Sequence, residues 1–358
     1  MHRNFSMAAV SLVATAAVVT GVATVGHAAA ASHGDSGRTG TIAFVRLGPG
    51  PDFGGGLFVV HPDGSGLRRL TGPATSVYWY AWSPDGRRIA YIDARGSLWL
   101  VHPDGTGSRL LLPTSHLSSA QLSWSPDGKA IAIISPGPKT SPGSAASTKI
   151  GLYVVPVDGA PPVALPGGRH VGWDVAWSPR GNEIAYNNGG TFVIRPDGTG
   201  RRRVSPPGSG DSIRWSADGA QLAFNVLIHR SNGSAERYRA FGVVDADGTN
   251  FHVVTEHAYN EYGVAWSPHG RRLLYGRGDR QGIYVIGADG RNNRRVTRDA
   301  PPQAGWGALA WSPTGGSIVY STGGTDNSDL YVIGVDGRDK VRLTNTPDDD
   351  IDPSWVAR

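Results

Sequence analysis

The sequence predicts an all-β fold, a seven-bladed β-propeller made of four-stranded antiparallel blades. Three observations predict it. A short apolar segment that ends in tryptophan recurs seven times, six of these tryptophans precede a turn that begins with serine, and the two ends of the chain carry incomplete repeats that complement each other. The recurrence, at about 40–50 residues, matches the length of one four-stranded propeller blade.

Each repeat begins with a predicted strand A that ends in tryptophan. These tryptophans are Trp82, Trp124, Trp177, Trp215, Trp266, Trp311 and Trp355. After the first of them the chain reads Ser83-Pro84-Asp85-Gly86. Proline presets φ for the second position of a type I turn, and glycine accepts the left-handed conformation that turns the chain back. Each such turn predicts a hairpin between strand A and a following strand B.

Strands B and C are continuously apolar runs, such as residues 89–92 and 98–101 in the first full repeat. An uninterrupted apolar run predicts a strand buried on both faces, as a blade is between two neighbouring blades. An Asp-Gly pair follows strand C, for example Asp104-Gly105, and predicts a second hairpin. Strand D is more polar, which is expected for the outer edge of a blade.

The two ends of the chain complete each other. Residues 41–71 supply strands B, C and D without a preceding tryptophan strand, and residues 352–355 supply a lone strand A. We therefore expect the C-terminal strand A to pair with the N-terminal strands B–D, which forms the seventh blade and closes the propeller over residues 41–358. Closure removes the exposed sheet edges.

Residues 1–31 have the features of a secretory signal: a basic start, an uncharged run over residues 7–26, and a closing stretch of alanines. An uncleaved membrane anchor is the alternative, because the run is nearly long enough to span a bilayer. Residues 32–40 are expected to form a flexible leader. We expect a secreted or periplasmic, extracytoplasmic protein without stable membrane insertion once the signal is cleaved.

The composition excludes several classes of function. The chain has 358 residues and no cysteine, which rules out disulfides, thiolate catalysis, a cysteine-ligated zinc site and a lipidated N-terminal cysteine. Its formal net charge of +5 is a mild basic bias for this length, so we expect no nucleic-acid partner. We also expect a monomer that carries no cofactor.

The repeats resemble those of TolB-type propellers. The resemblance rests on the Trp-Ser-Pro-Asp-Gly turn that begins at Trp82, the Ile-Ala-Tyr strand at residues 89–91, the Leu-Tyr-Val strand at residues 330–332 and the Asp-Gly…Leu-Thr segment that follows it. It covers about residues 41–356 and implies the propeller alone, without the N-terminal α/β domain of TolB. Similar repeats form the propellers of dipeptidyl-peptidase-like enzymes, but the chain has no Gly-x-Ser-x-Gly nucleophile motif.

The D–A and B–C loops are expected to form the ligand face, around the mouth of the central channel, because they vary while the other turns are stereotyped. Residues 226–239 are expected to extend two strands beyond their blade. Aromatic rings beside carboxylates at this mouth suit sugars or peptides, and inter-blade packing of the tryptophans is the alternative. The candidate ligand-binding residues are Tyr78, Trp79, Trp173, Asp174, Asp211, Glu261, Tyr262, Trp306 and Asp350. Asp352, just before Pro-Ser-Trp, has instead the position of a structural residue of the repeat.

Four histidines, His116, His170, His229 and His257, fall in loops on the same predicted face. Three converging imidazoles can hold a metal ion, but these residues show no fixed ligand spacing. The sequence therefore leaves a metal site open without predicting one.

Two functions stay open. The first is an exported, non-catalytic binding or scaffold propeller that engages a protein or glycan of the cell envelope on the D–A/B–C loop face. The alternative is a polysaccharide lyase or hydrolase with its site at the channel mouth, since some propellers with similar repeats are pectin-oligosaccharide lyases that use metal-bound histidines. The absence of a catalytic motif or domain favours the first function.

Overall fold

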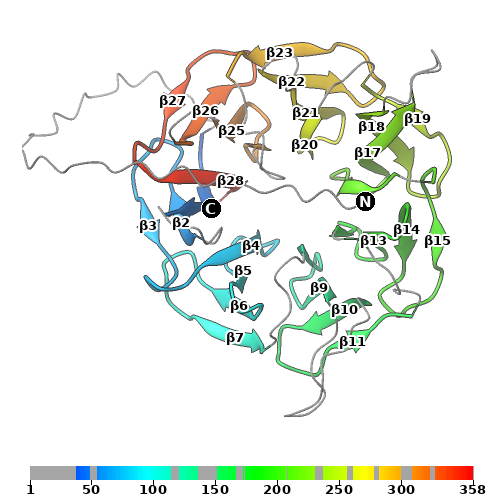
Figure 1. Cartoon of the computed structure of the whole chain (residues 1–358), viewed down its shortest axis with the longest axis horizontal. Coiled ribbons are helices and arrows are strands. Elements are labelled where there is room, and N and C mark those ends of the chain that lie inside the picture. The colour runs from blue at the N-terminus through cyan, green and yellow to red at the C-terminus, as the bar shows by residue number, and fades with distance from the viewer. Residues whose placement is uncertain are drawn as a thin grey trace, which may run out of the picture. The chain divides into compact units, whose positions relative to one another are not determined.

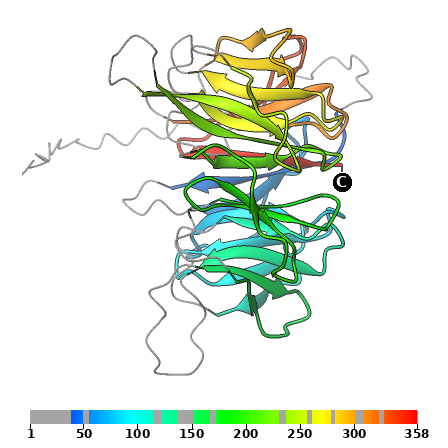
Figure 2. The ribbon, with the colours of Figure 1, turned by 90° about the vertical axis from the view of Figure 1, so that its right-hand side faces the viewer.

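The computed structural model describes residues 38–48, 55–113, 121–135, 151–166, 172, 174–207, 209–229, 237–255, 261–277, 282–299, 309–322 and 327–357. Their regular structure is entirely β, with 28 strands in seven four-stranded antiparallel sheets. Figure 1 shows the sheets as blades around a central axis, and Figure 2 shows the same blades from the side. The predicted seven-bladed propeller is confirmed.

Six blades follow the predicted strand order A, B, C, D. Blade 1 contains β4 (Val77–Trp82), β5 (Ile89–Asp93), β6 (Leu98–Val101) and β7 (Arg109–Leu112). Blade 2 contains β8 (Leu122–Trp124), β9 (Ala130–Ser135), β10 (Gly151–Pro156) and β11 (Val163–Ala164). Blade 3 contains β12 (Val175–Trp177), β13 (Ile184–Asn187), β14 (Thr191–Ile194) and β15 (Arg202–Arg203).

Blade 4 contains β16 (Asp211–Trp215), β17 (Gln221–His229), β18 (Arg237–Asp245) and β19 (His252–Val253). Its middle hairpin is long, as residues 226–239 predicted, because β17 and β18 stay paired out to His229 and Arg237. Blade 5 contains β20 (Glu261–Trp266), β21 (Arg272–Arg277), β22 (Gly282–Gly287) and β23 (Arg294–Thr297). Blade 6 contains β24 (Leu309–Trp311), β25 (Ser317–Ser321), β26 (Leu330–Gly334) and β27 (Val341–Arg342).

The seventh blade joins the two ends of the chain. Its order is β28 (Asp349–Val356), β1 (Thr41–Leu47), β2 (Gly56–Val60) and β3 (Arg68–Arg69). Ile42 pairs with Trp355, and the red β28 lies beside the blue β1 in Figure 2. The predicted closure by the C-terminal strand is therefore confirmed.

Every blade is buried on both faces, as the continuous apolar runs predicted. One core cluster contains Ile92 and Leu98 of blade 1 together with Trp124 and Ile131 of blade 2. The next combines Ala132 and Leu152 of blade 2 with residues of blade 3. Burial of apolar surface between neighbouring sheets thus stabilises the whole ring.

In several A–B turns the serine that follows the strand A tryptophan holds the hairpin together. The Ser83 hydroxyl donates to Oδ1 of Asp85 at 2.6 Å and accepts from the backbone N–H of Arg88 at 2.9 Å. Ser125 and Ser216 make the same two bonds in their turns. The sequence interpretation rested on proline and glycine, and it missed this role of the serine.

In four blades the indole of the strand A tryptophan donates a hydrogen bond to the preceding blade. Nε1 of Trp124 donates to the carbonyl oxygen of Ala81, one residue before Trp82 in the preceding blade, at 3.0 Å. Trp215, Trp266 and Trp311 make the equivalent bond to Ala176, Arg214 and Ala265. Nε1 of Trp177 donates instead to the carbonyl oxygen of Gly181 in its own blade, and Nε1 of Trp355 to that of Thr39. Among the described residues, the buried Nε1 of Trp82 has no hydrogen-bond partner.

Residues 1–31, the predicted secretory signal, lie outside the described residues, as does the predicted leader up to residue 37. Within the part of the chain that the structure describes, no helix is long and apolar enough to cross a membrane.

Candidate functional site

A central channel runs between the inner strands of the propeller and has a cavity volume of about 540 Å³. All seven strands A contribute to its lining, from β4 round to β28. Each strand A lies at the inner edge of its sheet and pairs there with strand B of its own blade, and β4 makes one further bridge, from Val77 to Gly55. The channel wall therefore combines side chains with backbone groups that the sheets leave unpaired.

Four of the inner strands carry a β-bulge near their start: β4, β16, β20 and β28. Three bulges place a residue at positive φ, namely Ser212 at 59°, Gly263 at 48° and Asp352 at 52°. Glycine adopts this conformation freely, whereas serine and aspartate do so at some cost. A bulge redirects the side chains around it, so these strands do not simply alternate between channel and blade.

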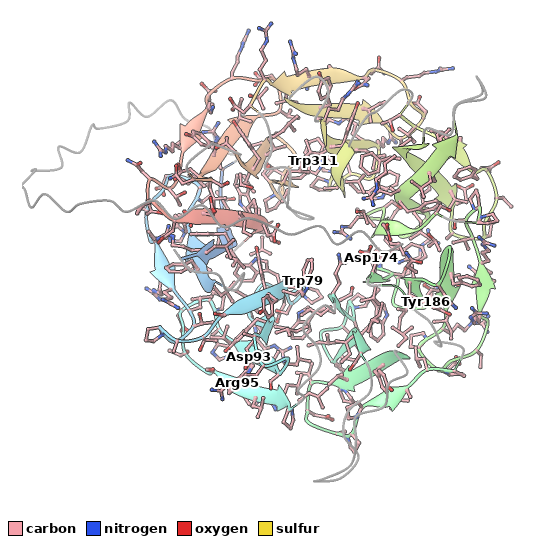
Figure 3. All side chains as sticks on the ribbon, in the orientation of Figure 1. Trp79, Asp93, Arg95, Asp174, Tyr186 and Trp311 are labelled. Atoms are coloured by element: carbon pink, nitrogen blue, oxygen red, sulfur yellow. The ribbon has the colours of Figure 1, made fainter. Side chains whose placement is uncertain are left out.

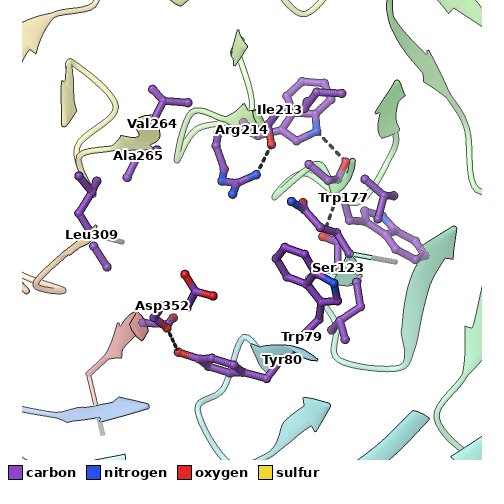
Figure 4. Close-up of a pocket in the computed structure, with 18 of the residues that line it drawn as sticks. Trp79, Tyr80, Ser123, Trp177, Ile213, Arg214, Val264, Ala265, Leu309 and Asp352 are labelled. Atoms are coloured by element: carbon purple, nitrogen blue, oxygen red, sulfur yellow. Dashed lines mark hydrogen bonds between the residues drawn. The ribbon is translucent and has the colours of Figure 1, made fainter. Parts of the chain in front are cut away.

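Arg214 supplies a positive charge to the channel wall. It precedes Trp215 in β16, lines the cavity, and donates from Nη1 to the carbonyl oxygen of Ile213 at 2.8 Å. The same nitrogen lies 4.0 Å from Oδ1 of Asp174. Figure 4 shows the guanidinium reaching into the opening.

Asp174 stands behind Arg214 and is only 2% exposed. Its Oδ2 accepts from the backbone N–H of Ser212 at 2.7 Å. Burial raises the pKa of the Asp174 carboxyl above its ordinary value of 3.8, against the opposing effects of Arg214 and the Ser212 N–H. Figure 3 places Asp174 and Trp79 close to the central opening, with Asp93 and Arg95 farther out.

Asp352 supplies a negative charge to the same channel from β28. Its backbone is held by Tyr80, whose hydroxyl lies 2.5 Å from the carbonyl oxygen of Asp352 and 2.7 Å from that of Ala43. Burial, together with the nearby Asp352 carboxylate, raises the pKa of Tyr80 well above its usual value, so this hydroxyl stays protonated. In Figure 4 the Asp352 carboxylate and the Arg214 guanidinium face one opening from different blades.

The other predicted site residues have different environments. Tyr78 and Trp79 line the channel, as predicted. Asp211 lies in a second, smaller cavity between blades 3 and 4. Asp350 is fully buried in a bidentate ion pair with Arg46, with oxygen–nitrogen distances of 2.6 and 2.9 Å. Burial raises the pKa of Asp350, and the Arg46 guanidinium opposes this effect.

The structure does not describe the side chains of several predicted site residues. Glu261 and Tyr262 begin β20, and His229 ends β17, but their side chains are not described. Trp173, Trp306, His116, His170 and His257 lie outside the described residues altogether. Among the side chains that are described, no group of three His, Asp or Glu residues is placed to hold a metal ion.

The prediction missed Arg214, although the repeat carries a signal for it. The residue before the strand A tryptophan is small in the other six repeats: Ala81, Ser123, Ala176, Ala265, Ala310 and Ser354. Five of these small residues, all but Ala81, line the channel. A lone arginine at this position therefore indicates a charge directed into the channel.

Comparison with known proteins agrees with this architecture. The family described as TolB beta propeller domain matches residues 41–307. The chain belongs to the TolB β-propeller family. The matched segment begins at β1 and ends at residue 307, just before β24.

Solved structures similar to this TolB-family propeller share its fold at low sequence identity. TolB from Acinetobacter baumannii is 17% identical, with a TM-score of 0.56, over 89% of this chain and 67% of that one. An oligogalacturonate lyase in complex with manganese is 15% identical, with a TM-score of 0.63, over 78% and 82%. The β-propeller domain of the Trilobed protease from Pyrococcus furiosus, described as having an open velcro topology, is 11% identical, with a TM-score of 0.54, over 76% and 86%.

Proposed function

We propose that this propeller is a non-catalytic binding module that takes an extended segment of a partner protein into the mouth of its channel. The observation that carries the proposal is the pairing of opposite charges in one opening, Arg214 on β16 and Asp352 on β28. A peptide offers both amide N–H donors and carbonyl or carboxylate acceptors, so it can contact both charged groups at once.

Three further features support binding at this mouth. The cavity of about 540 Å³ falls within the range typical of ligand pockets. The inward edges of the strands A offer backbone groups of the kind that bind extended chains. Tyr78 and Trp79 add aromatic surface on which a peptide side chain can pack.

We also propose that the protein acts outside the cytoplasmic membrane, as a secreted or periplasmic protein. The support is the sequence of residues 1–31, with its basic start, uncharged run and alanine-rich end. Fractionation of cells that produce the full chain, with mass determination of the mature N-terminus, tests this part. Uncleaved protein in the cytoplasm contradicts it.

A peptide selection tests the binding site. A phage-displayed library of random peptides is selected on the folded protein, and enriched peptides are measured by fluorescence anisotropy against Arg214→Gln and Asp352→Asn. Asparagine tolerates the left-handed backbone of position 352, so the second variant removes the charge and keeps the fold. We expect each variant to weaken binding about tenfold, equivalent to about 1.4 kcal/mol. Failure to enrich any peptide, or binding by both variants that equals binding by the parent chain, contradicts the proposal.

The alternative function is a polysaccharide lyase or hydrolase that acts at the same mouth. Its support is the shared fold with an oligogalacturonate lyase that binds manganese. The structure does not describe the side chains of the four histidines that are candidates for its metal site. An activity assay therefore has to test this alternative. Turnover of oligogalacturonate and other acidic glycans, with and without added manganese, tests it, and measurable turnover favours the enzyme over the binding module.

A further inference from the structure

A second cavity lies between blades 3 and 4 and shares no lining residue with the central channel. Its volume is about 130 Å³. Asn187 at the end of β13, Asp211 at the start of β16, and Asn225 and Leu227 of the long strand β17 line it, together with Arg239 of β18. Both blades are drawn in green in Figure 1.

The register of blade 4 places these groups side by side. Asp211 pairs with Asn225, and Leu227 pairs with Arg239, so the four residues occupy neighbouring rungs of one sheet. The extension of β17 and β18 beyond the start of β16 supplies the outer rung. The cavity therefore depends on the same long hairpin that distinguishes this blade from the others.

The inner part of the cavity offers hydrogen-bond acceptors. Asn225 is only 7% exposed, and its Nδ2 donates to Oγ of Ser212 at 3.3 Å, while its Oδ1 has no hydrogen-bond partner within the described part of the chain. The Asp211 carboxylate accepts from Nδ2 of Asn187 at 2.8 Å through Oδ1. A buried acceptor without a partner destabilises a folded protein, so one that lines a cavity indicates a ligand that donates to it.

The outer part of the cavity offers hydrogen-bond donors. Arg239 is exposed and already makes a contact within the chain, and its guanidinium carries five N–H donors, enough to serve a ligand carboxylate in addition. Leu227, directly opposite in the sheet, is 47% exposed and is one of the few large apolar side chains with this exposure in the described residues. The rim thus combines a cation with an apolar surface.

We propose that this cavity binds a small zwitterion, an α-amino acid with a short apolar side chain. Its ammonium group donates to Oδ1 of Asn225 and to the Asp211 carboxylate, and its carboxylate accepts from Arg239. Its side chain packs on Leu227. A volume of 130 Å³ corresponds to about four waters at roughly 30 Å³ each, which suits a molecule of about six non-hydrogen atoms.

Isothermal titration calorimetry of the folded chain with L-alanine tests the proposal. Ethylamine, which lacks the carboxylate, and propionate, which lacks the ammonium group, are the comparison ligands. We expect L-alanine to bind and each comparison ligand to bind at least about tenfold more weakly, since each loses one charged contact. No heat from L-alanine means that the cavity holds water only, and equal affinity for all three compounds means that it does not recognise the two charged groups of the ligand. Either result overturns the proposal.

Substitutions of residues that line the cavity then test which of them contact L-alanine. Asn225→Leu and Arg239→Gln should each abolish or weaken L-alanine binding at least about tenfold. Arg294→Gln, which removes an exposed arginine of β23 away from the cavity, is the matched control and should bind like the parent chain. Because Asn225→Leu removes an unpartnered buried acceptor, its melting temperature should equal or exceed that of the parent. Unchanged binding by both cavity variants overturns the assignment.

Discussion

Arg46 and Asp350 form a bidentate ion pair across the junction of β1 and β28, and this pair fastens the first strand of the propeller to the last. The Asp350 side chain is fully buried and that of Arg46 is 12% exposed. The guanidinium also lies 4.8 Å from the ring centroid of Phe58 in β2. Closure of the ring thus combines backbone pairing with one buried charge pair.

Removal of one partner of this pair should destabilise the propeller strongly. Asp350→Ala leaves the Arg46 guanidinium buried without its counter-ion, and we expect a loss of about 3–5 kcal/mol in the free energy of unfolding. Urea denaturation followed by tryptophan fluorescence measures it. The double variant Arg46→Met with Asp350→Leu should recover most of the loss, and a single variant as stable as the parent contradicts the structural role.

The indole hydrogen bonds between blades predict that two equivalent tryptophans contribute differently to stability. Nε1 of Trp124 donates to the carbonyl oxygen of Ala81, whereas Nε1 of Trp82 is buried without a partner. Replacement by phenylalanine should therefore cost about 1 kcal/mol more at Trp124 than at Trp82, because only the first change breaks a hydrogen bond. Thermal denaturation of the two variants in parallel measures this difference. Equal losses would show that the indole bonds contribute nothing to stability.

Removal of the buried carboxyl of Asp174 should increase the stability of the folded protein by an amount that depends on pH. Its pKa in the folded protein is raised above the unfolded value, so its contribution to stability is fully present below about pH 3.8 and is lost as the pH rises through the folded pKa. Asp174→Asn should therefore stabilise the protein at pH 7, and the gain should shrink as the pH falls toward 4. Chemical denaturation across this range checks the slope, and a gain that grows on acidification contradicts it.

Asp85, in the turn that follows Trp82, supplies a control whose pH dependence has the opposite sign. The hydroxyl of Ser83 lowers the pKa of Asp85, so the stability that this carboxylate contributes is present at neutral pH and is lost as the pH falls through its lowered pKa. Asp85→Asn should therefore destabilise the protein at pH 7, and the difference from the parent should vanish in acid.

The serine of the repeated turn is expected to contribute to every A–B hairpin. Ser125→Ala removes the hydroxyl that donates to Asp127 and accepts from the N–H of Ala130. Ser125 is 4% exposed, so the N–H of Ala130 loses its partner in a buried turn, and we expect a loss of about 1–2 kcal/mol. Denaturation by urea measures it, and Ser125→Thr, which keeps the hydroxyl, should retain part of the stability.

The sequence was sufficient to predict the fold because the evidence for it is local and repeated. Each turn after a strand A tryptophan and each Asp-Gly pair marks a hairpin within a few residues, and the apolar runs mark strands buried on both faces. The incomplete blades at residues 41–71 and 352–355 predicted closure, and the pairing of Ile42 with Trp355 confirms it.

The candidate site could be predicted only in part, because its residues converge from strands far apart in the chain. Tyr78 and Trp79 were recognised by chemistry and position, and both line the channel. Asp350 has the same chemistry, yet Arg46 holds it in a buried pair more than 300 residues away in sequence, a partner that sequence spacing does not reveal.

The sequence by itself determined the number of blades, the order of their strands and the closure of the ring. Only the tertiary structure decided which charges face the channel, because bulges at Ser212, Gly263 and Asp352 alter the alternation of side chains along the inner strands. Hairpin formation is governed by neighbouring residues, whereas the direction and burial of a charged group depend on packing between blades.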